Sequence, residues 1–66
     1  MNDNLFQIEE TLSPKMKWLR RHHLTIRITA GVIECYHGMD RVSYGDDEMA
    51  VLVNAATSLN VPLWNQ

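Results

Sequence analysis

Residues 24–36 read LTIRITAGVIECY, and the hydrophobic pattern of this stretch decides the fold. Apolar and polar side chains alternate along residues 24–29, which is typical of a strand with one buried face. Isoleucine and threonine dominate it, and such β-branched side chains pack well on a pleated sheet. The pair Ala30-Gly31 is suited to a turn, and a second apolar segment follows it. The stretch therefore predicts an antiparallel β-hairpin.

A two-residue loop at Ala30-Gly31 would fix how the two strands pair. It places Ile28 opposite Ile33, Arg27 opposite Glu34 and Ile26 opposite Cys35. This register gathers the apolar side chains on one face and puts an ion pair on the other, so pairing and patterning agree. Because Ala-Gly is not the Asn-Gly pair that tight hairpins prefer, a loop longer by one residue stays open.

The chain after the hairpin predicts a second turn, a short edge strand and a helix. The turn falls on residues 38–40, and the alternation over residues 41–44 predicts a strand with Val42 and Tyr44 on one face. The helix begins at Gly45-Asp46, because the three acids at 46–48 can cap its N–H groups and complement its dipole. Its apolar side chains share one broad face, formed by Met49, Leu52, Val53, Ala56 and Leu59.

The C-terminal residues predict an extended tail. Asn60 ends the helix, and Pro62 opposes its continuation because proline lacks an N–H group and restricts the residue before it. Residues 61–64 should therefore run extended and return Trp64 to the core.

A helix is also predicted before the hairpin. Ser13 can cap free N–H groups with its side-chain oxygen, and the ring of Pro14 suits the first helical position. The helix should cover residues 14–22, with a narrow apolar stripe of Leu12, Met16, Leu19 and His23. Residues 1–12 are compatible with a helix or a strand, and the spacing of their apolar residues favours a short helix.

The predicted order is α-β-β-(β)-α, which defines a small α+β fold. We expect one domain over residues 1–66, with residues 1–4 and 65–66 frayed. It should be a two-layer sandwich with two helices on one face of a two- or three-stranded antiparallel sheet. The other face would be left to solvent or a partner, and it carries Thr25, Arg27, Thr29, Val32, Glu34 and Tyr36.

The composition indicates a globular chain with a thin core. It has 66 residues, of which 45% are hydrophobic and 21% are charged. A folded chain of this length buries only about 60% of the surface that its unfolded form exposes, so a homodimer or another partner would add stability. The single cysteine excludes an intramolecular disulfide. We expect a cytoplasmic protein, since we find neither a secretion signal nor a membrane span.

The charges are arranged in two groups although the net charge is only −2. Residues 15–27 hold five of the six basic residues, whereas three acids stand together at 46–48. Such a bipolar charge distribution can steer and orient a partner.

The helix at residues 14–22 is the candidate binding site. Its proposed partner-binding residues are Lys17, Trp18, Arg21 and His22, because interface hot spots favour Trp and Arg. As an alternative, basic side chains release counterions from nucleic acid phosphates, which would use Lys15, Lys17, Arg20, Arg21 and Arg27. The acidic pI of about 5.8 lowers the weight of nucleic acid. The plainer interpretation is a solvated helix whose Trp18 packs on the C-terminal tail or on residues 5–8.

No catalytic residue, cofactor or metal is expected. Cys35, His37 and His23 could come together near one end of the sheet, but their spacing matches no zinc motif, and a buried structural Cys35 is favoured. The acids at 46–48 are explained by helix capping more simply than by a magnesium site. We also find no nucleophile motif or phosphate-binding loop.

Two resemblances to known families bear on fold and function. The order α-β-β-β-α resembles the double-stranded RNA-binding domain, but that family begins its last helix with a lysine-rich turn, where this chain has GDDEMA at 45–50. Acids there would repel phosphates, so the RNA-binding mode is not carried over. Residues 44–56, YGDDEMAVLVNAA, are similar to HicB-type antitoxin N-terminal domains, and NVPLWNQ at 60–66 looks like the ending of small uncharacterised phage and prophage proteins.

These resemblances imply a noncatalytic, mobile-element-encoded protein that binds another macromolecule. Together with the charge pattern, they lead us to expect a small regulator or inhibitor of a larger protein partner. A nucleic-acid-binding regulator is the alternative, and a homodimer through an uncovered sheet face or edge is a further expectation.

Overall fold

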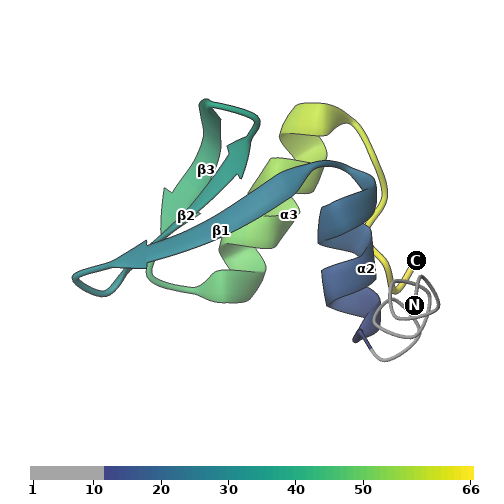
Figure 1. Cartoon of the computed structure of the whole chain (residues 1–66), viewed down its shortest axis with the longest axis horizontal. Helices are drawn as coiled ribbons and strands as arrows, with labels where there is room; N and C mark the ends of the chain where they lie inside the picture. Colours follow the sequence, from purple (N-terminus) through teal and green to yellow (C-terminus); the bar gives the residue numbers. More distant parts are fainter. Residues whose placement is uncertain (1–11) are drawn as a thin grey trace, which may run out of the picture.

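The computed structural model describes residues 12–66, which fold into two helices and a three-stranded antiparallel sheet (Figure 1). The elements in chain order are α2 (Pro14–Arg21), β1 (Leu24–Thr29), β2 (Val32–His37), β3 (Asp40–Gly45) and α3 (Glu48–Leu59). The strand order is β1-β2-β3, α3 packs against β2 and β3, and α2 packs against β1. The predicted α+β class and the third strand are confirmed. A short helix is predicted within residues 1–12. Only residue 12 of this segment is described, so this prediction lies outside the described residues.

The first hairpin has the predicted register. Arg27 lies opposite Glu34, and Ile26 and Ile28 lie opposite Cys35 and Ile33. The loop is the two-residue form, because Thr29 already pairs with Val32. Ala30 and Gly31 both have positive φ, of 51° and 81°, and this conformation matches the twist of the two strands.

The second hairpin differs from the prediction in its turn and in its register. The turn is Gly38-Met39, since Asp40 already pairs with His37. The register then shifts between Cys35 and Tyr36, which corresponds to an extra residue in β3. The predicted common face for Val42 and Tyr44 is therefore wrong.

The shift turns Ser43 towards the core and Tyr44 towards solvent. Ser43 lies opposite Cys35 and is buried, and its hydroxyl donates to the carbonyl oxygen of Val51 at 2.7 Å. Tyr44 lies opposite Glu34 and is 61% exposed. This hydrogen bond ties β3 to the first turn of α3.

The N-terminal end of α2 agrees with the predicted capping chemistry, and its C-terminal end lies one residue before the predicted His22. The side-chain oxygen of Ser13 accepts a hydrogen bond from the N–H of Met16 at 3.2 Å, and Pro14 begins the helix. The helix ends at Arg21, with His22 as its C-terminal cap. His23 has a φ of 57° and turns the chain into β1.

Helix α3 begins later than predicted and turns a different face to the sheet. Asp47 caps it by accepting a hydrogen bond from the N–H of Ala50 at 2.9 Å. Its buried residues are Val51, Leu52, Ala55 and Ala56. Of the predicted face, Leu52 and Ala56 are buried and Leu59 packs against the core. Met49 and Val53 were wrongly included, because both of these side chains are substantially exposed.

Small residues let α3 approach the sheet closely on this face. The two alanines add little bulk, and a Cβ atom on Gly45 would lie 3.4 Å from a methyl group of Val51. The face that α3 turns to the sheet therefore combines two large buried side chains, Val51 and Leu52, with two small ones, Ala55 and Ala56.

The C-terminal tail closes the core as predicted. Asn60 adopts the left-handed conformation that ends α3, and the N–H of Val61 bonds to the carbonyl oxygen of Ala56 at 3.0 Å. Trp64 then packs against the core, with its ring centroid 5.6 Å from that of Trp18. The indole N–H of Trp18 donates to the carbonyl oxygen of Pro62 at 2.7 Å, so α2 and the tail are directly bonded.

We predict that Trp18→Phe lowers the free energy of unfolding by about 1–3 kcal/mol. Phenylalanine keeps an aromatic ring but loses the part-buried hydrogen bond to Pro62 and part of the ring volume that Trp18 buries, and these two losses together cost about this much. Urea unfolding followed by circular dichroism measures the change. Met39→Ala is the control because Met39 is 95% exposed. Equal stability of Trp18→Phe and the parent chain would contradict the importance of this bond.

Candidate binding surfaces

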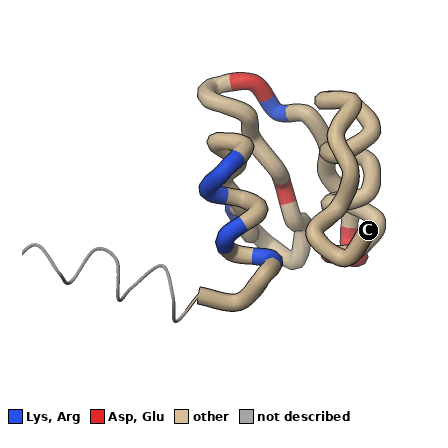
Figure 2. Tube along the Cα trace, turned by 90° about the vertical axis from the view of Figure 1, so that its right-hand side faces the viewer, with Lys and Arg blue, Asp and Glu red and all other residues tan. Residues whose placement is uncertain are grey.

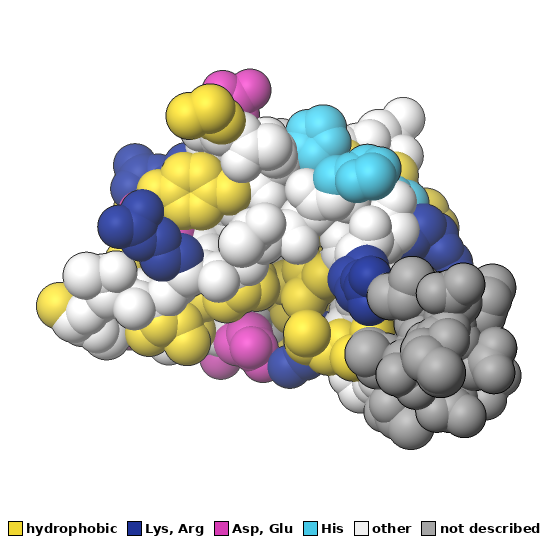
Figure 3. All heavy atoms as spheres, in the orientation of Figure 1, with side chains coloured by type: hydrophobic (Ala, Val, Ile, Leu, Met, Phe, Trp, Pro, Cys, Tyr) yellow, Lys and Arg dark blue, Asp and Glu magenta, His cyan; other side chains and the backbone are white. Residues whose placement is uncertain are grey.

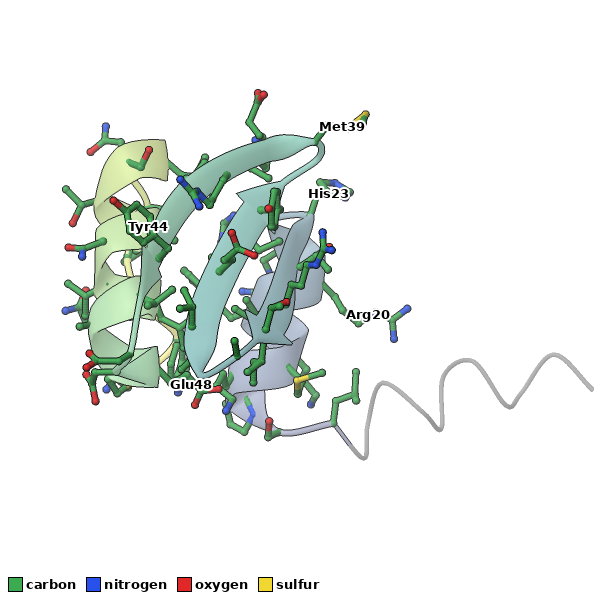
Figure 4. All side chains as sticks on the ribbon, turned by 90° about the vertical axis from the view of Figure 1, so that its left-hand side faces the viewer. Arg20, His23, Met39, Tyr44 and Glu48 are labelled. Atoms are coloured by element: carbon green, nitrogen blue, oxygen red, sulfur yellow. The ribbon has the colours of Figure 1, made fainter. Side chains whose placement is uncertain are left out.

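The basic side chains of α2 form one exposed surface, which we call the α2 basic face. It consists of Lys17, Arg20 and Arg21, and Figure 2 shows the basic positions spaced along this helix. Arg20 points away from the body of the protein (Figure 4). No acid within residues 12–66 forms an ion pair with these three residues. Lys15, by contrast, pairs with Glu48 at 3.0 Å and joins the starts of the two helices.

Trp18 does not belong to that exposed surface. Its side chain is 2% exposed, because the ring packs against Trp64 and its N–H group is bonded to Pro62. His22 lies against it, with the ring centroids 5.4 Å apart in an edge-on arrangement. The expectation of an exposed Trp18 in the partner-binding set is therefore wrong. Packing on the tail, the plainer alternative, is correct.

The five residues considered for nucleic acid binding do not form one surface. Three make up the α2 basic face, whereas Lys15 is held by Glu48. Arg27 lies on β1, on the sheet face opposite to the core. The predicted ion pair between Arg27 and Glu34 is replaced by another, because the Glu34 carboxylate binds Arg41 at 2.9 Å.

The sheet face that no helix of residues 12–66 covers carries a group of four side chains that we call the outer sheet cluster. Its members are Glu34, Tyr36, Arg41 and Tyr44, from β2 and β3. The Glu34 carboxylate accepts hydrogen bonds from Arg41 at 2.9 Å and from the Tyr36 hydroxyl at 3.4 Å. The hydrogen bond to Glu34 holds the pKa of the Arg41 guanidinium above its usual value, so this side chain keeps its positive charge.

Arg41 also contacts Tyr44, which completes the cluster. Its guanidinium carbon lies 4.2 Å from the centroid of the Tyr44 ring, in cation–π geometry. Figure 4 looks onto this sheet face and labels Tyr44 on β3. A hollow of about 270 Å³ lies beside the pair and is lined by Arg41, Val42, Ser43, Tyr44 and Asn54.

This cluster was not predicted from the sequence, because the cluster depends on the extra residue in β3. With Gly38-Met39 as the turn, an extra residue in β3 places Tyr44 opposite Glu34 and on the same face as Tyr36 and Arg41. The sequence prediction assumed a turn at residues 38–40 followed by strictly alternating side chains, and it therefore placed Tyr44 on the same face as Val42.

Cys35 is closed off from chemistry at the surface. Its side chain is 0% exposed, and burial raises the pKa of its thiol, which a hydrogen bond with the Ser43 side chain opposes only in part. Within residues 12–66, no three or more His, Cys, Asp or Glu side chains are grouped to hold a metal ion. His23 and His37 lie at strand ends and are exposed.

Comparison with known proteins gives no relative. No family model matches the chain, and neither the curated proteins nor the solved structures contain a significant match. In the part of the chain that the structure describes, no helix has the length and apolar character needed to cross a membrane.

We predict that Cys35 in the folded protein reacts with a thiol reagent such as Ellman's reagent at least about 100-fold more slowly than in the unfolded chain. Burial excludes the reagent, and the raised pKa lowers the thiolate fraction at pH 8. Absorbance at neutral to mildly alkaline pH measures the rate, and the same chain in concentrated guanidinium chloride is the control. Fast labelling under folding conditions would contradict the buried position.

The raised pKa of the Cys35 thiol also makes the free energy of unfolding depend on pH. Because the thiol stays protonated in the folded chain above its usual pKa of 9.0, its contribution is full below that pH. This contribution to the free energy of unfolding declines as the pH rises further, since the thiol then loses its proton in the unfolded chain before it does so in the folded chain.

Proposed function

We propose that this protein is a noncatalytic binding protein that regulates or inhibits a larger protein partner, and that the outer sheet cluster is its main contact surface. The observation that carries the proposal is the Arg41–Tyr44 pair, in which a mostly exposed aromatic ring is held in place by a guanidinium group beside a hollow. Tyrosine and arginine are enriched among residues that dominate binding energy in protein interfaces.

The charge within the outer sheet cluster favours a protein over a nucleic acid at this surface. The Glu34 carboxylate already accepts a hydrogen bond from Arg41, and it would repel a phosphate that approached the same guanidinium. A protein interface tolerates such an internally paired cluster, because hydrogen bonds and apolar ring surface can both be used. The ordering of Arg41 between Glu34 and Tyr44 also reduces the conformational entropy lost on binding.

The environment of Cys35 supports a noncatalytic function. This side chain is the only thiol in the sequence, and it is packed between the sheet and α3 and not in a cleft. A nucleophilic cysteine needs access to substrate and a lowered pKa, whereas burial raises the pKa of this one.

We predict that the Arg41→Ala/Tyr44→Ala double variant binds the protein partner at least about 30-fold more weakly than the parent chain, as expected when an interface loses about 2 kcal/mol of hot-spot contacts. The partner is first captured from cell lysate with the tagged chain in the presence of nuclease, identified and purified. Calorimetry with the purified partner then gives the dissociation constants. Both side chains are exposed, so the variant should fold normally.

The matched control for this experiment is Lys17→Ala/Arg21→Ala, which removes two exposed side chains from the α2 basic face. It should change the affinity by less than about threefold. If the control weakens binding and Arg41→Ala/Tyr44→Ala does not, the partner uses α2 and the proposed surface is wrong.

Nucleic acid binding through the α2 basic face is the second candidate. The observation in its favour is that Lys17, Arg20 and Arg21 extend into solvent from one short helix with no ion-pair partner among residues 12–66. Three phosphate contacts would make the logarithm of the binding constant for duplex DNA fall by about 2.7 for each tenfold rise in salt.

We predict for this candidate that Lys17→Ala lowers the salt slope by about 0.9, with little dependence on DNA sequence. Fluorescence anisotropy of a labelled duplex across a salt series measures the slope, and Met39→Ala should leave it unchanged. Binding that is absent at low salt, or equal in Lys17→Ala and the parent chain, would exclude this role for α2.

A further inference from the structure

Among residues 12–66, strand β1 forms an open edge of the sheet, and it has few features that prevent pairing with another strand. Its six residues pair with β2 on one side only, and the β1–β2 register is regular throughout. It has no proline, and its one charged residue, Arg27, points to the outer face. The opposite edge, β3, is protected by its register shift and by an Asp40-Arg41 start.

An apolar groove runs along β1 on the core side of this edge. It measures about 390 Å³ and is lined by Met16 and Leu19 of α2 and by Leu24 and Ile26 of β1. Lys15, Arg20 and Glu48 form its polar rim. Figure 3 shows hydrophobic side chains along this side of the molecule, between the β1–β2 end and α2.

The same strand carries an apolar side chain that projects from the sheet. Ile28 is 65% exposed, although it lies on the same strand face as Leu24 and Ile26. Thus β1 has a groove near its first residues and a projecting isoleucine near its last. If a second copy of β1 pairs with it antiparallel, Ile28 of each copy comes to lie at the groove of the other copy.

We propose that two copies of this protein associate through antiparallel pairing of β1 with β1, so that Ile28 of each copy packs at the groove of the other. The proposal is independent of the protein partner proposed above. Pairing of this kind gives a closed twofold dimer, because the same surface is used on both copies.

The charge on β1 selects the register of the pairing. Side chains on one face must meet side chains on the same face, so the twofold axis passes through a residue. Axes through Ile26 and Arg27 pair the largest part of β1, residues 24–28 and 25–29 respectively. An axis at Arg27 would oppose two positive charges directly, which is unfavourable. An axis at Ile26 instead places Arg27 opposite Thr25 and Ile28 opposite Leu24, which lines the groove.

The first test is the molar mass of the full chain by sedimentation equilibrium between 1 and 100 μM, a range in which a dimer with a dissociation constant of about 10 μM changes from minor to dominant. We expect a dimer at the upper concentrations. Ile28→Glu should raise the dissociation constant at least about 100-fold, since it places a charge in an apolar contact. Met39→Glu, in the exposed β2–β3 turn, is the matched control and should dimerise like the parent.

Disulfide trapping tests the register with exposed positions, so neither substitution disturbs the core. Under mild oxidation, a mixture of Thr25→Cys and Arg27→Cys chains should form the mixed dimer, whereas each variant alone should crosslink little. Efficient crosslinking between Thr25→Cys and Thr29→Cys chains, which both keep Arg27, would overturn the Ile26-centred register, because an axis at Arg27 places these two exposed positions opposite each other. Two results would overturn the proposal. One is a parent chain that is monomeric at 100 μM, whatever occupies its groove. The other is a dimer whose dissociation constant is unchanged by Ile28→Glu in a normally folded variant.

Discussion

The burial of Trp18 under the C-terminal tail, with its indole N–H bonded to the Pro62 carbonyl oxygen, is the constraint that closes the described core. It joins the first described helix to the tail, and these segments are far apart in the sequence. Trp18 also packs against Trp64, so one side chain covers the end of the core that α3 and the sheet leave open. Among residues 12–66 the buried core has eight apolar residues, so one large ring of this kind accounts for a substantial part of the buried area.

This structural use of Trp18 changes where the binding surface lies. A tryptophan among arginines on a helix predicts an interface hot spot, but the ring cannot serve the core and a partner at the same time. What remains for a partner on the α2 basic face is charge without an aromatic ring, whereas aromatic and charged groups are combined on the outer sheet face in the outer sheet cluster. The bipolar arrangement of charge in the sequence is therefore accompanied by two chemically different surfaces, one suited to anionic groups and one to protein.

The sequence predicted those parts of the fold in which one local rule acts alone. The β1–β2 register follows from the Ala30-Gly31 turn and the period of two, and the cap at Ser13 follows from side-chain chemistry. The β3 shift could not be predicted, because it depends on Ser43 reaching a carbonyl group of α3. The outer sheet cluster could not be predicted either, because it depends on this register shift. The burial of Trp18 was one of two open alternatives, since only the three-dimensional position of the tail decides it.

Dimerisation through β1 would alter the outer face as well as the edge. The order of strands would become β3-β2-β1-β1-β2-β3, and because same-face pairing is preserved, both outer sheet clusters would lie on one continuous face. With strands about 4.8 Å apart, the two β3 strands would be separated by about 24 Å. A partner with repeated or symmetric features could then contact both clusters, and the second contact would form at high effective concentration. Weak individual contacts on such a small domain would thus suffice for tight binding.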